Sequence, residues 1–394
     1  MNQKEIYQQA PVDYDVIVLG VGSMGSAACY YLAREGLRVL GIEQYSIPNH
    51  LSSHAGQSRI VRKAYFEHPD YVPLLQLAYK GWKELEEATG KQVYYETGLL
   101  YAGQPESVLL KGVARAAAQY NIALSHLAPG QLHNQLPHIQ LPANYVAFVE
   151  PEAGFVLPEL AVQLFAQGAL QNGAQLHSKE RVLNWSMGSK TVQVTTNKGT
   201  YTAAKIIITT GAWTAGLLPA LSHILAVTRQ TMAWLKAKNP DRFRLGKMPC
   251  WMIADTDHAG VFYGFPQLGS LDAADPGGFK MAHHHPGTGT TADTVRRMVE
   301  PGEDAVLRQV FERYFPHQYA GTLQMKTCMY TNTPDQHFLL GKLPGYGADI
   351  LLAAGFSGHG FKFVPAVGRI MCDLVTKGKT DIPIGFLQPS RFSA

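Results

Sequence analysis

The stretch Asp15-Val16-Ile17-Val18-Leu19-Gly20-Val21-Gly22-Ser23-Met24-Gly25 decides the fold of this chain. Its four consecutive apolar residues, 16–19, predict a strand that is buried on both faces, as in a parallel sheet. Gly20, Gly22 and Gly25 fit the pattern G-x-G-x-x-G. The first glycine permits a tight turn, the second lets a pyrophosphate approach the backbone, and the third lets the next helix lie close to the strand. The stretch therefore predicts a strand, turn and helix that bind a dinucleotide.

The residues that follow complete this dinucleotide-binding unit. Small residues favour a helix ending near Gly36, and residues 37–42 predict a second buried strand that ends in Glu43. Glu43 lies 23 residues after Gly20, where its carboxylate can accept hydrogen bonds from a ribose hydroxyl. The same carboxylate would repel a 2′-phosphate, so NADP is disfavoured, whereas NAD and FAD both fit.

Length and composition are those of a globular enzyme with two domains. A chain of 394 residues is too long for one ordinary core. The net charge of +4 is mild and no run of basic residues stands out, so nucleic-acid binding has little support. We find no signal peptide, no apolar run near the ~20 residues that span a bilayer, and no C-x-x-C pair among four cysteines. We therefore expect a cytoplasmic protein without a membrane partner, disulfide framework or metal site.

Apolar periodicity outlines the remaining elements. Helices are expected at 71–90, 107–121, 158–170 and 291–314, and strands at 93–102, 145–149, 175–177, 181–183, 192–196, 201–202, 205–208, 227–237, 251–265 and 349–355. The hairpin around Asn197-Lys198-Gly199 is uncommon in the second half of a nicotinamide dehydrogenase. It favours a two-domain architecture of the FAD-binding type.

A second glycine-rich turn lies near the end of the chain. Gly355-Phe356-Ser357-Gly358-His359-Gly360-Phe361-Lys362-Phe363 follows a buried strand and precedes a helix that begins near Val364 and ends near Gly378. Backbone N–H groups at such a turn stabilise an anion. A reduced flavin is anionic at its N1–O2 edge and would use this turn, for which an NAD dehydrogenase has little need.

Several polar residues invite either a structural or a functional interpretation. Arg59 and Arg62 would share a face if their segment were helical; they fit surface arginines as well as guanidiniums beside a flavin or an anionic substrate. Lys280 lies on a mostly apolar predicted strand. Either its apolar stem covers the strand while its ammonium group reaches solvent, or the lysine has a functional role at this position. Residues 283–285 are histidines that would alternate between the two faces of a strand, so they cannot all bind one metal ion. Cys328 is by default a buried structural cysteine.

Taken in order, these segments resemble the monomeric sarcosine oxidase family, which includes N-methyltryptophan oxidase and pipecolate oxidase. The matching stretches span nearly the whole chain: Tyr14 to Gly25, Gly56-Gln57-Ser58-Arg59-Ile60-Val61-Arg62, Tyr263-Gly264-Phe265-Pro266, Gly278-Phe279-Lys280, Cys328-Met329-Tyr330-Thr331, and Gly355 to Phe363. The last two are much more specific than the dinucleotide pattern.

The resemblance implies an α/β fold: a Rossmann-like FAD-binding domain of the D-amino-acid-oxidase/glutathione-reductase type, with a second, α+β substrate domain built on an antiparallel sheet. The FAD-binding domain would be discontinuous, with residues 12–90, 150–220 and 325–385. Residues 91–149 and 221–324 would form the substrate domain. A monomer is expected.

The resemblance also implies the roles of individual residues. Arg62 and Lys362 would bind the substrate carboxylate, and Tyr263 would line the pocket. Catalytic roles would fall to Lys280 on the oxygen-reducing side of the flavin, to Arg59 on its other face, to His284 near the amine and to Tyr330 beside the ring. Cys328 would hold FAD through a thioether to the flavin 8α-methyl group. The other cofactor-binding residues would be Gly20, Gly22, Ser23, Met24, Gly25, Glu43, Gln44, Ser53, Ser58, Val182, Gly211, Gly358, His359, Gly360 and again Lys362.

One segment departs from the family pattern. Members usually carry two histidines where this chain has His54-Ala55, and Asp-Thr where it has Gln57-Ser58. The loss of an imidazole beside the flavin puts the side-chain preference and the rate in question, but not the redox core.

The expected activity is FAD-dependent oxidation of a secondary amino acid, either N-methylated or cyclic, by O2. The products would be hydrogen peroxide and an imine, which water hydrolyses to an amine and an aldehyde. The alternatives are a flavin dehydrogenase that passes electrons to another acceptor, and a non-catalytic FAD-binding subunit.

Overall fold

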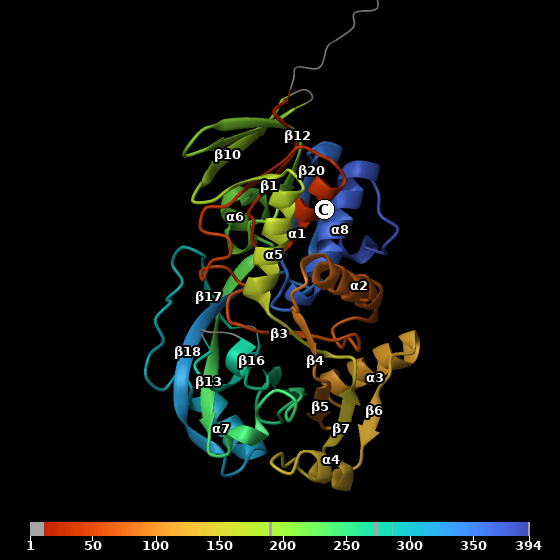
Figure 1. Ribbon diagram of the computed structural model, residues 1–394, viewed down its shortest axis with the longest axis vertical. Helices are drawn as coiled ribbons and strands as arrows, with labels where there is room; N and C mark the ends of the chain where they lie inside the picture. Colours follow the sequence, from red (N-terminus) through yellow and green to blue (C-terminus); the bar gives the residue numbers. More distant parts are fainter. Residues whose placement is uncertain (1–11, 189–190, 272–274, 286, 393–394) are drawn as a thin grey trace, which may run out of the picture.

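The computed structural model describes residues 12–188, 191–271, 275–285 and 287–392. Two large sheets and a group of helices make up the molecule, which is elongated in Figure 1. The helices are α1 (Ser23–Arg34), α2 (Val72–Thr89), α3 (Val108–Tyr120), α4 (Pro129–Gln135), α5 (Pro158–Gln171), α6 (Thr214–Leu217), α7 (Ala305–Tyr314) and α8 (Val364–Lys377).

The first sheet contains the dinucleotide-binding unit. Its strands are β1 (Tyr14–Leu19), β2 (Val39–Ile42), β9 (Gln175–His177), β10 (Val182–Met187), β11 (Val192–Thr196), β12 (Thr200–Ile208), β19 (Leu339–Lys342) and β20 (Ile350–Ala354). The parallel neighbours β9, β2, β1, β12 and β20 form its centre. Strands 201–202 and 205–208, expected as two, are one continuous strand, because the first part of β12 pairs with β11 and its last part with β20.

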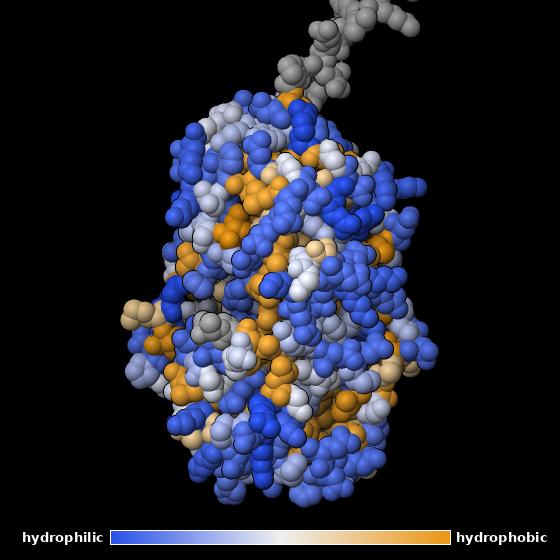
Figure 2. Space-filling view, viewed as in Figure 1, coloured by the Kyte–Doolittle hydropathy of each residue, from blue (hydrophilic) through white to orange (hydrophobic). Residues whose placement is uncertain are grey.

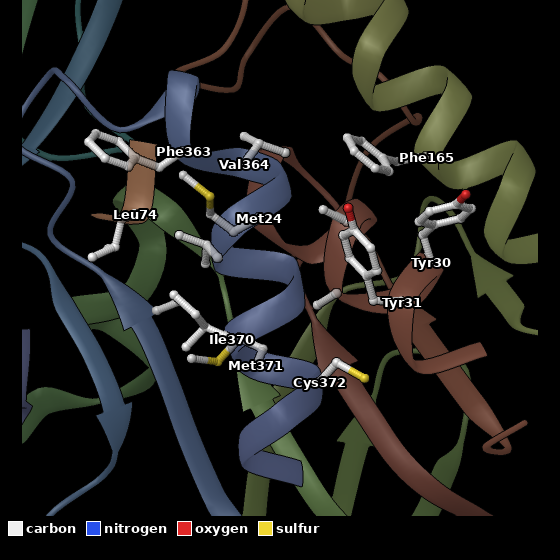
Figure 3. Close-up of a cluster of buried hydrophobic side chains, with 14 of the residues drawn as sticks. Met24, Tyr30, Tyr31, Leu74, Phe165, Phe363, Val364, Ile370, Met371 and Cys372 are labelled. Atoms are coloured by element: carbon white, nitrogen blue, oxygen red, sulfur yellow. The ribbon is translucent and has the colours of Figure 1, made fainter. Parts of the chain in front are cut away.

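Helices α1, α5, α8 and α2 pack together on this sheet (Figure 1). Figure 3 shows part of the apolar core around α8, to which Met24, Tyr31 and Phe165 contribute together with Val364 and Met371. Gly25 lets α1 begin close to the preceding turn, because a Cβ atom there would lie 1.9 Å from the carbonyl oxygen of Gly20. The strand, turn and helix predicted from the first glycine-rich stretch are therefore confirmed.

The second sheet is dominated by the long antiparallel pair β13 (Ala226–Ala237) and β18 (Tyr319–Asn332), seen side by side in Figure 1. Its other strands are β5 (Leu99–Gly103), β6 (Ser125–Leu127), β7 (Val146–Glu150), β14 (Cys250–Ile253), β15 (Val261–Gly264), β16 (Phe279–His284) and β17 (Thr288–Thr290). Most neighbours in this sheet are antiparallel, with β5 and β14 as a parallel pair. This mixed architecture is the expected fold class; the division into two discontinuous domains stays a prediction.

A small third sheet contains β3 (Arg59–Val61), β4 (Tyr94–Glu96) and β8 (Gly154–Val156). The alternative that Arg59 and Arg62 lie on one face of a helix is wrong, because β3 pairs with β8 in extended conformation. Likewise the strand expected at 93–102 is two strands, since Gly98 has φ +72° and breaks the run. The helix expected at 291–314 begins only at Ala305, where its apolar face covers the second sheet.

The face of the molecule in Figure 2 is mostly polar, with apolar residues gathered in a narrow band between polar surroundings. None of the helices in the described ranges combines the length and apolar character that crossing a bilayer requires.

Candidate active site

A cavity of about 800 Å³ joins the ends of β1, β3, β16 and β18 to both glycine-rich turns. Its volume lies in the range of sites that enclose a cofactor-sized ligand. Most of the predicted site residues line it: Gly20, Gly22, Ser23, Met24, Glu43, Gln44, Ser53, Arg59, Arg62, Val182, Gly211, Tyr263, His284, Tyr330, Gly358, His359, Gly360 and Lys362. Gly25, Ser58, Lys280 and Cys328 are not among the lining residues.

The first glycine turn is shaped for close approach of a ligand. Gly20 has φ +89°, and a Cβ atom there would lie 2.8 Å from the carbonyl oxygen of Thr209. Gly22, in contrast, faces open space apart from His54 Nδ1, 3.9 Å from an added Cβ. The turn therefore exposes the backbone of Gly22 while Gly20 and Gly25 hold strand and helix together, as a pyrophosphate requires.

Glu43 is fixed by the same turn. Its carboxylate accepts hydrogen bonds from the backbone N–H groups of Val21 and Tyr45, both at 3.0 Å. Burial raises its pKa, and these N–H groups oppose that rise. The carboxylate lines the cavity at the end of β2, where a ribose would lie.

The second glycine turn brings backbone and rings together. Gly358 has φ +78°, and a Cβ atom there would lie 2.4 Å from the Tyr330 ring. The Tyr65 hydroxyl lies 2.5 Å from His359 Nδ1. Burial lowers the pKa of His359 to about 3, so its imidazole is neutral. The turn thus offers backbone groups and an uncharged ring at the start of α8.

Arg62 and Glu67 form a two-point ion pair in the cavity wall. The Arg62 Nη2 atom lies 2.6 and 2.7 Å from the two carboxylate oxygens of Glu67. The guanidinium also lies over the rings of Tyr65 and Phe66, at 4.2 and 4.7 Å from their centres. Burial would raise the pKa of Glu67, but Arg62 brings it down to about 2, so the pair is ionised.

Lys362 adds a second buried cation beside this pair. Its Nζ atom donates to the carbonyl oxygen of His359 at 2.8 Å. Burial, together with the nearby Arg62, lowers the pKa of Lys362 to about 7, and Glu67 opposes this. With two cations and one carboxylate, this part of the cavity suits an anion.

Neutral polar groups form the facing wall. His284 Nδ1 lies 3.3 Å from the Tyr330 hydroxyl, and burial lowers the pKa of His284 to about 4. His283, its neighbour on β16, turns to the other face, where it stacks on Phe262 with ring centres 4.0 Å apart. The expectation that one histidine of the triplet faces a pocket is therefore confirmed. No cluster suited to a metal ion occurs among the described residues.

Cys328 lies just behind the cavity wall. Its Sγ atom is 3.9 Å from Arg59 Nη2 and 3.4 Å from the carbonyl oxygen of Ser53, and both of these residues line the cavity. Lys280 is fully enclosed nearby, with its Nζ atom donating to the carbonyl oxygens of Gly56 and Ser58 at 2.5 and 2.7 Å. Burial lowers the pKa of Lys280 well below its usual range.

The lining also includes residues to which the sequence assigned no role, among them Glu67, Met252 and His54, the last of which was noted only as part of the His54-Ala55 departure. Glu67 stands in an irregular segment, and only its distance from Arg62 reveals it. His54 is 2% exposed and its Nε2 atom has no partner in the protein. An unpaired buried polar atom at the cavity costs free energy, so it fits a site that a polar ligand completes.

These features fit FAD: a pyrophosphate turn, a ribose carboxylate, a second anion-stabilising turn and an orphaned imidazole, all on one cavity. The fold and site together define a dinucleotide-binding flavoprotein oxidoreductase.

The chain belongs to the FAD-dependent oxidoreductase family, whose model matches residues 15–374. It is 39% identical to monomeric sarcosine oxidase of Streptomyces avermitilis, over 97% of this chain and 98% of the relative. It is 32% identical to N-methyl-L-tryptophan oxidase of Yersinia pestis, over 97% of this chain and 100% of the relative. The fold matches that of NikD, an amino acid oxidase of nikkomycin biosynthesis, with a TM-score of 0.84 and 23% identity. The match covers 95% of this chain and 97% of the NikD chain. The resemblance to the sarcosine oxidase family, and with it an FAD-dependent oxidase, is confirmed.

Proposed function

We propose that this protein oxidises a secondary amino acid, N-methylated or cyclic, with O2 as the acceptor. The observation that carries the proposal is the pair of buried cations, Arg62 and Lys362, in a cavity whose facing wall is neutral. The names of the sarcosine and N-methyl-L-tryptophan oxidases support the same substrate class. The products would be hydrogen peroxide and an imine, which water hydrolyses to an amine and an aldehyde.

Arg62 and Lys362 would bind the substrate carboxylate. Glu67 already occupies Arg62 Nη2, so a substrate carboxylate either shares the guanidinium or displaces Glu67. Arg62 presents a planar fork and Lys362 a point charge, so together they fix the position and direction of the carboxylate. This would hold the rest of the substrate in one orientation, which lowers the entropic part of the barrier.

His284 and Tyr330 would contact the substrate amine. The amine has to react in its neutral form, and the imidazole of His284, which burial keeps neutral, can accept a hydrogen bond from it on nitrogen. The cations Arg62 and Lys362 disfavour a third positive charge nearby, which lowers the pKa of a bound ammonium. Tyr263 would line the pocket beside the ring of Tyr330.

FAD would be held by Gly20, Gly22, Ser23, Met24, Glu43, Gln44, Ser53, Val182, Gly211, Gly358, His359 and Gly360. When bound, it supplies the redox chemistry by taking two electrons from the amine and giving two to O2. Gly25 and Ser58 would act indirectly. Gly25 lets α1 pack close to the turn, and Ser58 accepts a hydrogen bond from Lys280. Arg59 and Lys280 would stabilise negative charge that develops beside them in a low-dielectric site.

Cys328 would carry the cofactor through a thioether to the flavin 8α-methyl group. Its support is the position of Sγ, which touches the cavity-lining residues Arg59 and Ser53. The new C–S bond would replace one S–H and one methyl C–H bond, and O2 would take up the two electrons and two protons as hydrogen peroxide. In a Cys328→Ala variant we expect loss of flavin fluorescence from the protein band on a denaturing gel. Cys250→Ala, at a buried cysteine in β14, is the matched control.

The activity is tested with a panel of amines scored for peroxide under air, beginning with sarcosine, N-methyltryptophan and pipecolate. Dimethylamine and piperidine, which lack the carboxylate, are the matched controls for sarcosine and pipecolate. We expect peroxide only from carboxylated amines. A protein that contains FAD but yields no peroxide with any of them would contradict the proposal, and reduction of a dye without peroxide would indicate a dehydrogenase.

We further propose that the protein is a cytoplasmic monomer with the two discontinuous domains described above. The four free cysteines, all buried, are typical of a reducing compartment.

A further inference from the structure

The segment 53–58 surrounds two cations with backbone carbonyl groups. Arg59 donates to the carbonyl oxygens of Ser53, Ala55 and Ser58 at 3.0, 2.6 and 2.8 Å. Lys280 donates to Gly56 O at 2.5 Å, Ser58 O at 2.7 Å and Ser58 Oγ at 3.1 Å. None of these acceptors is a carboxylate, so the direct contacts of both cations are to neutral groups.

Glu159 provides a negative charge on the opposite side of the same segment. It stands in the first turn of α5, and its Oε1 atom accepts from Gly56 N–H at 2.7 Å and from Gln57 N–H at 3.2 Å. Its Oε2 atom also lies 3.2 Å from Gln57 N. Both residues have positive φ, +123° for Gly56 and +70° for Gln57, which turns their consecutive N–H groups toward the carboxylate.

One peptide group connects Glu159 to Lys280. The carbonyl oxygen of Gly56 and the N–H of Gln57 belong to the same peptide, and in a trans peptide they point in opposite directions. Lys280 donates to that carbonyl and Glu159 accepts from that N–H. The peptide is therefore polarised by an anion at one end and a cation at the other, and each hydrogen bond strengthens the other.

We propose that Glu159 is a positioning residue for Lys280: through the Gly56–Gln57 peptide it orients the carbonyl that holds the ammonium and compensates its buried charge. The inference rests on the proposed function, in which Lys280 serves the reaction with O2. Glu159 differs from an acid that only stabilises the start of its own helix, because its carboxylate accepts hydrogen bonds from the N–H groups of residues 56 and 57 at 2.7–3.2 Å.

The titratable and charged groups around Lys280 are Arg59, Glu159, Cys250 and Cys328. Lys326 is a further charge close to this set: its Nζ atom lies 5.3 Å from the centre of the Trp234 ring, and Lys280 Nζ lies 5.8 Å from the same centre. Glu159 is the anion of this set at neutral pH, since its backbone hydrogen bonds and Arg59 outweigh burial and lower its pKa. Removing the Glu159 charge therefore makes Lys280 lose its proton at lower pH.

The test compares the FAD-containing wild-type protein with Glu159→Gln, in which an amide oxygen can still accept one N–H. Glu152→Gln, an exposed charge paired with Lys63, is the matched control. The flavin is photoreduced without substrate and mixed with O2 between pH 6 and 10. We expect reoxidation of Glu159→Gln to be at least ~10-fold slower near pH 8. The midpoint of its pH profile should move to lower pH, while Glu152→Gln behaves as wild type.

The absorption spectrum of the oxidised flavin gives a readout without turnover. The midpoint of its pH titration should also move to lower pH in Glu159→Gln. Glu159→Asp retains the charge but is too short to reach both N–H groups, so we expect slower reoxidation with little change in midpoint. Wild-type rates and midpoints in Glu159→Gln overturn the inference; should that variant fail to fold, an unchanged rate in Glu159→Asp overturns it. Slow reoxidation of the wild-type protein instead overturns the proposed oxidase function.

Discussion

Arg62 and Glu67 neutralise each other in the cavity wall, with Arg62 Nη2 2.6 and 2.7 Å from the two carboxylate oxygens. Arg62 is 2% exposed. A cation buried to this degree needs a partner, and Glu67 supplies it; under the proposed function a substrate carboxylate would compete with Glu67 for Arg62.

Glu67→Gln should make the protein depend on an anionic ligand for stability. Breaking a buried pair on one side typically costs 3–5 kcal/mol because it leaves a charge uncompensated. We expect a lower Tm than wild type, and a larger rise in Tm when a simple carboxylate such as isobutyrate is added. Differential scanning fluorimetry with and without the carboxylate measures both. Equal ligand-induced shifts in the two proteins would show that Glu67 does not compete with the ligand.

Binding of a simple carboxylate should weaken as the pH rises above about 7. The pKa of Lys362 is lowered to about 7, so the free site loses this charge as the pH rises through that value. A bound carboxylate favours the protonated form, so Kd should increase up to tenfold for each pH unit above it. Perturbation of the flavin spectrum gives Kd. Lys362→Met should bind more weakly at pH 6 and lack this dependence; a wild-type Kd constant from pH 6 to 9 would contradict the assignment.

Three histidines at the cavity, the buried His54 and His359 and the partly buried His284, should make the protein lose stability as the pH falls below 6.5. Burial lowers the pKa of His54 and His284 to about 4, and that of His359 to about 3. Between these values and the ordinary 6.5 the unfolded chain binds more protons than the folded one, so stability rises with pH in this window. The free energy of unfolding, measured by urea titration, should be lower at pH 5.0 than at pH 6.5. In His284→Asn the difference between the two pH values should be smaller. Equal values at the two pH values in the wild-type protein would be inconsistent with neutral buried imidazoles.

Gly358→Ala should be more harmful than its backbone angle alone explains. A Cβ atom at 358 would lie 2.4 Å from the Tyr330 ring, and φ is +78°. Gly345→Ala is the matched control, because φ at this residue is +84° but an added Cβ atom would have no neighbour within 4 Å. Overpacking typically costs about 1–3 kcal/mol, so the free energy of unfolding should fall by that much more in Gly358→Ala. If the two variants lose equal stability, the Tyr330 ring moves aside without cost.

Lys280→Met should slow the reaction of the reduced flavin with O2 far more than reduction of the flavin by substrate. Loss of one well-placed electrostatic group in a dry site typically costs 10²–10³-fold. Stopped-flow measurement of each half-reaction separates the two. Lys326→Met is the control, since this lysine is on β18, whereas Lys280 is on β16, which pairs with the opposite edge of β13. Equal effects of Lys280→Met on both half-reactions would count against an oxygen-side role.

The sequence by itself determined the dinucleotide-binding unit and the nature of the cofactor site. The run 16–19, the spacing of Gly20, Gly22 and Gly25, and the acid at 43 are local features, and backbone sterics leave few structures that such a stretch can adopt. The apolar strand before Gly355 and the helix after Phe363 are likewise predicted from neighbouring residues alone. The first half of the segment 291–314 was predicted wrongly as helix, because apolar periodicity also occurs in irregular segments that pack on a sheet.

Only the tertiary structure decided which polar groups meet. Glu67 pairs with Arg62, and Glu159 reaches the segment that holds Lys280 across more than a hundred positions of sequence. Neither acid belongs to a pattern, because the direction of a side chain in a loop or helix end depends on what the rest of the chain packs against it. Burial likewise set the pKa of Lys362 and His284, since desolvation is a property of the assembled cavity and not of the residue.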